Sequence, residues 1–223
     1  MQLSEVFNSP KGVRWLTQGN YGYVHNGNKF DICERWRQGV NFKGETYIQS
    51  FRYSAMASSM LKVQSCVDRQ GASKIIIEFE CGDLDKIITH VQGSAERWIW
   101  QKTDATGAVL ESGEFQQGIF FPLLRIFEGA IIEALKQSPA TLILPDIRLS
   151  AKPSQKLSLY SETRHSFEVA PLSKHQGAHF RFIGGEYDAD NAYFVVRDHL
   201  LQFYQWQTQS MGTWQVSLDW KKL

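Results

Sequence analysis

Histidines are the side chains best suited to acid–base chemistry or metal binding, and this chain contains six of them. The closest pair is His175 and His179, a spacing that on a helix would place both imidazoles on one face. Because Gly177 lies between them and a strand pattern follows, we expect a loop here and no metal site. The sequence also has no motif for a cofactor, a phosphate or a catalytic serine, so we expect no cofactor and no catalytic residues.

Single histidines and carboxylates leave one enzymatic alternative open. An enzyme of the lipocalin or barrel type that acts on an apolar substrate would need such a side chain inside a cavity, with a shifted pKa. The candidates for this role are His90, His165 and Glu78. Among 23 acidic residues, chance pairs of carboxylates are expected, so the sequence favours a protein that is not an enzyme.

Aromatic side chains carry the most functional information. They make up 13% of the chain, and many fall on expected strands. One interpretation is that they form a large core; the other is that they line a cavity for an apolar or amphiphilic ligand, with arginines near the rim to bind a carboxylate or phosphate headgroup. The candidate ligand-binding residues are Trp36, Trp98, Trp100, Phe121, Phe127, Tyr204, Trp206, Arg35, Arg97 and Arg148.

Alternation with a period of two recurs along the chain and predicts half-buried β-strands. The Asn26-Gly27 pair favours a tight type I′ hairpin, and residues 152–156 read as a polar loop. We expect strands at residues 13–17, 21–25, 29–37, 45–54, 60–67, 73–80, 86–92, 96–102, 108–116, 141–144, 157–169, 179–183, 193–197, 200–207 and 213–220.

Helical spacing of apolar residues appears once, and it predicts a helix over 122–137. We expect the helix to bury Leu123, Phe127, Ile131 and Leu135. Its water-facing residues should be Arg125, Glu128 and Lys136. The predicted fold is therefore mostly β: a curved antiparallel sheet that forms a spiral β-roll or half-open barrel, with one mid-chain α-helix. We expect one domain over 1–223, with strand-rich parts at 13–117 and 140–221.

Charge and composition exclude several classes of protein. The 24 basic and 23 acidic residues give a net charge of +1, which argues against nucleic acid as a partner. Three cysteines without CxxC spacing indicate free thiols in a reducing compartment. The first residues do not resemble a signal peptide, and charges interrupt the longest apolar stretch, so we expect a cytoplasmic protein without a transmembrane segment.

Three segments in the last part of the chain carry a resemblance to a known family. They are Leu-Pro-Asp-Ile-Arg-Leu from Leu144, His-Phe-Arg-Phe-Ile-Gly-Gly-Glu-Tyr from His179, and Phe-Val-Val-Arg-Asp-His-Leu-Leu-Gln-Phe-Tyr from Phe194. Their order resembles the carboxy-terminal half of bacterial proteins described as glycolipid-binding. That resemblance implies a spiral β-roll similar to that of lipoprotein carriers, and it implies no catalytic residues.

Together these patterns favour a non-enzymatic protein that binds a lipid-like or glycolipid-like small molecule in an aromatic-lined cavity. One alternative is the barrel enzyme described above. A second is a structural or interaction protein without a ligand, whose exposed sheet edge pairs with another chain. We expect a monomer or a homodimer.

Overall fold

The computed structural model describes residues 1–82, 84–137, 140–145, 151–161, 177–183, 191–208 and 212–223, and the structural statements below refer to these residues. The helices are α1 (Leu3–Val6) and α2 (Arg125–Gln137). The strands are β1 (Val13–His25), β2 (Asn28–Lys29), β3 (Ile32–Asn41), β4 (Thr46–Ser54), β5 (Ser59–Val67), β6 (Ser73–Cys81), β7 (Leu84–Ser94), β8 (Arg97–Asp104), β9 (Val109–Gln116), β10 (Ile119–Phe120), β11 (Ala140–Pro145), β12 (Ala151–Ser161), β13 (Ala178–Ile183), β14 (Asn191–Arg197), β15 (Leu200–Thr208) and β16 (Gly212–Lys222).

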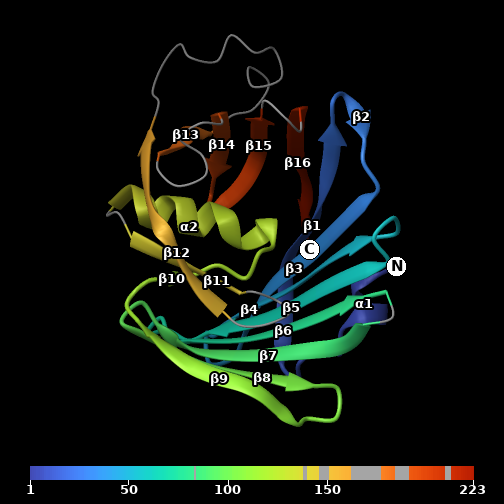
Figure 1. Cartoon of the computed structure of the whole chain (residues 1–223), viewed down its shortest axis with the longest axis vertical. Helices are drawn as coiled ribbons and strands as arrows, with labels where there is room; N and C mark the ends of the chain where they lie inside the picture. The colour runs from blue at the N-terminus through green and yellow to red at the C-terminus, as the bar shows by residue number, and fades with distance from the viewer. Residues whose placement is uncertain (83, 138–139, 146–150, 162–176, 184–190, 209–211) are drawn as a thin grey trace.

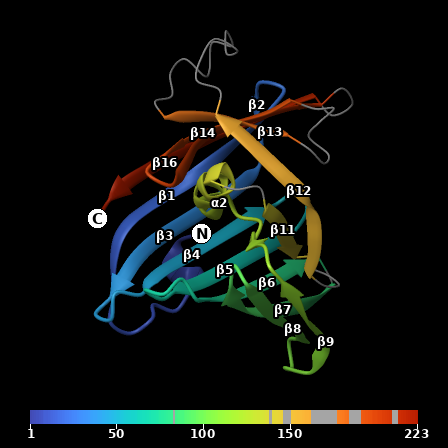
Figure 2. The same ribbon diagram turned by 90° about the vertical axis from the view of Figure 1, so that its left-hand side faces the viewer.

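All of these strands belong to one sheet that curls into a roll (Figures 1 and 2). The strand order is β10-β11-β12-β13-β14-β15-β16-β1-β3-β4-β5-β6-β7-β8-β9, and β2 pairs with β1 alone. Neighbouring strands are antiparallel except β10 and β11, which run parallel. The sheet is not closed, because β9 and β10 form its two edges. The prediction of a mostly β, curved antiparallel sheet with a mid-chain helix is confirmed.

The strand predictions hold along most of the described chain. Asn26 and Gly27 have φ values of 49° and 80°, the positive values that a type I′ hairpin requires. Residues 13–17 and 21–25 belong to one strand, β1, instead of two. The prediction of a loop at 152–156 is wrong, because the backbone there pairs with β11 as part of β12. The polar composition suggested a loop, but strands pair through backbone N–H and C=O groups, which polar residues also supply. Residues 162–169 of the expected strand lie outside the described residues.

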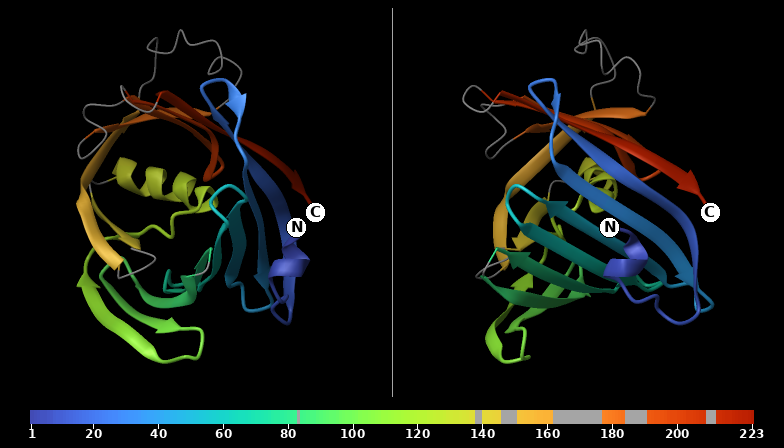
Figure 3. Two further views of the ribbon diagram at one scale, coloured as in Figure 1. Left: turned by 45° about the vertical axis from the view of Figure 1, so that its right-hand side comes forward. Right: turned by 90° about the vertical axis from the view of Figure 1, so that its right-hand side faces the viewer.

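Helix α2 lies in the concavity of the roll, against β12, β14 and β15 (Figures 1 and 3). It begins at Arg125 and not at 122, because Leu123 has a φ of 66°, which does not fit a helix. Ile132 and Leu135 are fully buried, whereas Leu123 and Phe127 are only half-buried. The prediction that Glu128 faces water is wrong, since its side chain is 6% exposed. Arg125 is also mostly buried, for a reason given below; Lys136 is exposed as expected.

The strand alternation gives the sheet an inner and an outer face. Glu34 and Arg52 hydrogen-bond to the chain at the start of α2, so their positions define the inner face. Trp36, Val63 and Ile77 share that face by register and belong to the core. The segment containing α1 covers the outer face of β3 and β4, where Gln49 Nε2 donates to the Asn8 carbonyl at 3.0 Å (Figure 3). The outer face of β5–β8 has no such cover among the described residues.

Candidate functional site

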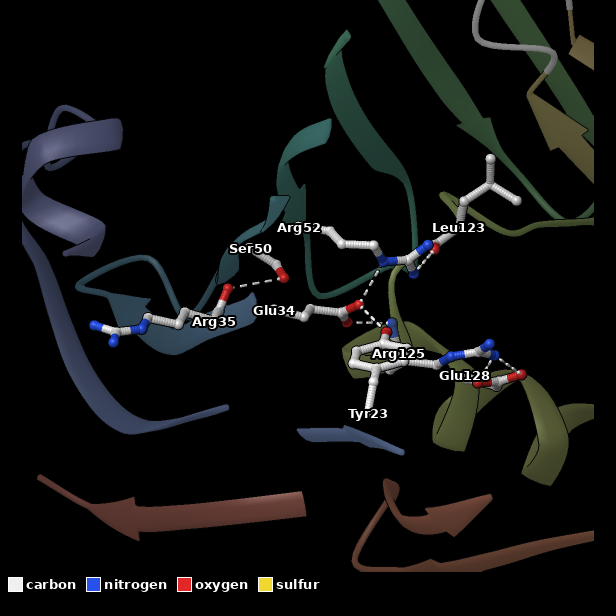
Figure 4. Close-up of polar contacts among 8 residues, drawn as sticks. All are labelled: Tyr23, Glu34, Arg35, Ser50, Arg52, Leu123, Arg125 and Glu128. Atoms are coloured by element: carbon white, nitrogen blue, oxygen red, sulfur yellow. Dashed lines mark hydrogen bonds and ion pairs between the residues drawn. The ribbon is translucent and has the colours of Figure 1, made fainter. Parts of the chain in front are cut away.

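A group of buried charged side chains joins the inner face of the sheet to the start of α2 (Figure 4). Its centre is Glu34 of β3, which is fully buried. Glu34 Oε2 accepts hydrogen bonds from Tyr23 Oη at 2.6 Å and from Arg52 Nε at 2.9 Å. Glu34 Oε1 accepts the backbone N–H of Arg125 at 2.6 Å. A strand carboxylate thus satisfies one of the free N–H groups at the helix N-terminus.

Two arginines complete this cluster, which we call the inner ion-pair group (Tyr23, Glu34, Arg52, Arg125 and Glu128). Arg52 Nη2 donates to the Leu123 carbonyl at 2.5 Å. Arg125 Nη1 donates to both carboxylate oxygens of Glu128, at 2.9 and 2.6 Å. Two carboxylates therefore face two guanidinium groups, which explains how Arg125 and Glu128 are buried on a helix face that the sequence assigned to water.

Burial and neighbouring charges shift the pKa values of the tyrosines and of Arg125 in this region. Burial raises the pKa of Tyr23 well above its usual value; Arg52 lowers it, and Glu34 raises it further. Burial also raises the pKa of the neighbouring Tyr21, helped by the charges of Glu34 and Glu128. Burial lowers the pKa of Arg125, but Glu128 and nearby tyrosines outweigh that effect and leave the pKa above its usual value. These phenols and the guanidinium therefore keep their protons near pH 7. The bonds from Glu34 and Arg52 attach the start of α2 to the sheet, so we assign the group a structural role.

The outer face carries a different arrangement over β4–β8. Directly opposed residues of these five strands form two adjacent rows. The first row is Tyr47, Cys66, Lys74, Gln92 and Ile99. The second row is Gln49, Gln64, Ile76, His90 and Gln101. Since neighbouring strands lie about 4.8 Å apart, each row spans about 20 Å across the sheet.

The first row lines a hollow of about 580 Å³, which we call the outer groove. An adjoining hollow of about 420 Å³ shares Lys74, Ile76, Gln92 and Ile99 with it and continues to His90 and Gln101. Ile99 on the groove wall is 42% exposed. Small-molecule sites have volumes of about 300–1,000 Å³, and the outer groove falls in that range. Its lining combines Tyr47, Ile76 and Ile99 with charged and amide side chains.

Charged residues border the outer groove at both ends. Glu45 and Asp68 lie at the β4–β5 end, while Lys74 and Arg97 lie toward β6–β8. Tyr47 Oη donates to Glu45 Oε2 at 3.3 Å, and a hydrogen bond with Cys66 raises the pKa of Tyr47 to about 12. Arg97 Nε donates to Glu114 Oε2 at 3.0 Å.

The structure distributes the candidate ligand-binding residues over both faces. Trp36, Trp98, Trp100 and Tyr204 are buried in the core, and Phe121, Phe127 and Trp206 are half-buried against it. Arg97 lines the outer groove, whereas Arg35 and the buried Trp36 line a separate hollow of about 360 Å³ beside α1. Arg148 lies outside the described residues. The described arginines and the buried aromatics therefore do not gather into one site.

The candidates for the enzymatic alternative lie on the outer face where they are described. Glu78 forms ion pairs with Lys86 at 2.5 Å and with Lys62 at 3.5 Å, and His90 is exposed. His165 and His175 lie outside the described residues. Within the described ranges, no three His, Cys, Asp or Glu side chains gather as they would around a metal ion. No helix of the described chain is long and apolar enough to cross a membrane.

Sequence reasoning missed the inner ion-pair group. A signal was present, because Glu34 lies two residues before Trp36 and so shares its face of the strand. A charged residue at an inward position of a strand calls for a buried partner. Its partners were not identifiable, because Arg52 lies on another strand and Arg125 is 91 residues away.

Comparison with solved structures finds a similar fold. A beta-barrel-like protein of a domain of unknown function (DUF1849) from Brucella abortus superposes with a TM-score of 0.53. The match covers 95% of this chain and 99% of that chain at 7% sequence identity, which supports the β-barrel-like fold and nothing finer. No protein-family model and no curated protein matches the chain.

Proposed function

We propose that this chain is a non-enzymatic protein that binds an apolar or amphiphilic, lipid-like small molecule, and that the outer groove holds the apolar part of the ligand. The supporting observation is a hollow of about 580 Å³ whose wall leaves Ile99 42% exposed. Covering that apolar surface with a hydrocarbon chain is favourable by about 25 cal/mol per Å². The aromatic side chains of the core then serve folding. We also propose a single domain over 1–223, since the described strands share one sheet.

Thermal unfolding in the presence of single-chain amphiphiles tests this function. A ligand that binds the folded state at 100 times its Kd adds about 2.7 kcal/mol to the free energy of unfolding. We expect at least one of a panel of alkyl amphiphiles, kept below micelle formation, to raise the Tm. Ile99→Ser should weaken that binding.

The matched control is Leu110→Ser, because Leu110 is 53% exposed on β9 and does not line the groove. This variant should bind as the unchanged protein does. If no amphiphile raises the Tm, or if Ile99→Ser and Leu110→Ser bind equally well, the groove is not the binding site.

A further inference from the structure

We propose that the outer groove selects a zwitterionic headgroup, with the ammonium at the β4–β5 end and the phosphate or carboxylate at Lys74. This inference rests on the function proposed above and names the class of ligand. It follows from the order in which charges of opposite sign occur across the strands that line the groove.

The β4–β5 end of the groove has the chemistry of a cation site. Glu45 and Asp68 carry the negative charges, and Tyr47 of β4, two residues after Glu45, lines the same hollow opposite Cys66. The hydrogen bonds that these carboxylates accept come from neutral groups: Asn41 Nδ2 and Tyr47 Oη for Glu45, and the N–H groups of Gln70 and Ala72 for Asp68. Neither carboxylate has an ion pair within the described part of the chain. Carboxylates beside an aromatic face suit an ammonium group, including a quaternary one.

The anion site is Lys74 of β6, opposite Cys66 on one side and Gln92 on the other. Lys74 is exposed, lines both hollows, and forms no ion pair with any described residue. The other cation of the groove, Arg97, is already paired with Glu114. Lysine binds phosphate as a point charge, so Lys74 provides the positive charge that remains open to a ligand.

The order of these groups distinguishes a zwitterion from a simple anion or cation. A purely anionic headgroup at Lys74 would also meet the negative charges of Glu45 and Asp68, and a purely cationic one would meet Lys74. A zwitterion places each charge against its opposite. The hydrocarbon chain then runs over Ile76 and Ile99 into the adjoining hollow.

Four amphiphiles with the same dodecyl chain test the proposal: a phosphocholine, a phosphate, a trimethylammonium and a maltoside. We expect the phosphocholine to bind about fivefold or more tightly than each of the other three, a difference typical of one or two exposed charge contacts. Titration calorimetry at low salt, below micelle formation, measures the four Kd values. A phosphate or maltoside that binds as tightly as the phosphocholine would overturn the zwitterion assignment.

Two variants test which residue of the groove binds which charge of the headgroup. Lys74→Ala should remove the preference for phosphocholine over trimethylammonium, and Glu45→Gln should remove the preference for phosphocholine over phosphate. Lys29→Ala, an exposed lysine on β2, is the matched control and should leave all four affinities unchanged. Unchanged preferences in both groove variants would contradict the assignment. Failure of all four amphiphiles to bind would instead reject the proposed function itself.

Discussion

Charged residues on the inner and outer faces of the sheet over β3–β8 differ in whether they are paired within the protein. On the inner face, Glu34 and Arg52 are bonded to each other and to the start of α2. On the outer face, Lys74 and Glu45 border a hollow and form no ion pair among the described residues. The inner charges are used within the protein, while Lys74 and Glu45 remain open to a ligand. We therefore expect inner substitutions to change stability and outer substitutions to change binding.

The largest effect on stability is expected for Glu34→Ala. Removing one partner of a buried ion pair typically costs about 3–5 kcal/mol, and the 26% exposure of the Arg52 side chain places this case toward the lower value. Urea unfolding measures the loss. The control is Glu114→Ala, which breaks the exposed pair with Arg97 and should cost less than about 1 kcal/mol. Equal losses in the two variants would mean that the inner ion-pair group does not fix α2.

Two neighbouring isoleucines of β6 compare the faces directly. Ile77 points inward and is 1% exposed, while Ile76 lines the outer groove. Ile77→Ala should cost about 2–5 kcal/mol through lost burial and the cavity that remains. Ile76→Ala should cost less than half as much and weaken amphiphile binding. The assignment of faces fails if Ile76→Ala proves the more destabilising substitution in thermal or urea unfolding.

Two tyrosines of β1 allow a hydrogen-bonded hydroxyl group to be compared with one that has no hydrogen bond within the described part of the chain. Tyr23 Oη donates to Glu34, whereas Tyr21 Oη has no hydrogen-bond partner among the described residues. Tyr23→Phe should cost about 1.5–3 kcal/mol, the usual value for a hydrogen bond to a charged group. Tyr21→Phe should change stability by less than about 1 kcal/mol. Similar losses in both variants would show that the hydrogen bond to Glu34 does not determine the effect.

The same tyrosines should lower the stability of the folded protein at alkaline pH. Their pKa values are raised in the folded state, so their contribution to stability is complete below the unfolded pKa of about 10. That contribution is lost as the pH rises above this value, because only the unfolded state then releases the protons. Urea midpoints between pH 9 and 11 should fall in the unchanged protein and fall less steeply in Tyr23→Phe. Parallel curves would contradict this assignment.

The smallest effect concerns the ion pairs of the outer face. Burial raises the pKa of Glu78, but Lys86 and Lys62 outweigh burial and leave the pKa below its usual value. The stabilisation is therefore present above the unfolded pKa of about 4.3 and lost as the pH falls through the lower folded value. Glu78→Gln should flatten the acid limb of the stability curve by less than about 1 kcal/mol. A steeper acid limb in this variant would reverse the sign that we assign.

The sequence predicted the local structure better than it predicted the site. Alternation located the strands because side chains of a half-buried strand must alternate, and Asn26-Gly27 located a hairpin because of its positive φ values. The pairing of β16 with β1 was not predictable, since no local pattern links strands at opposite ends of the described chain. Predicting the outer groove also requires knowing which strands pair and in which register. Tyr47, Lys74 and Ile99 become neighbours only through strand register.

The position of β1 in the middle of the sheet has a consequence for the protein during its synthesis. One side of β1 can pair with β3 as soon as both have left the ribosome, but the other side pairs with β16. Thr213, near the start of β16, lies 187 residues after Asn26. At about 5–20 residues per second, translation leaves that edge of β1 unpaired for about 10–40 seconds. Open strand edges of this kind bind other chains readily, so this edge of β1 is exposed to pairing with other chains until β16 has been synthesised.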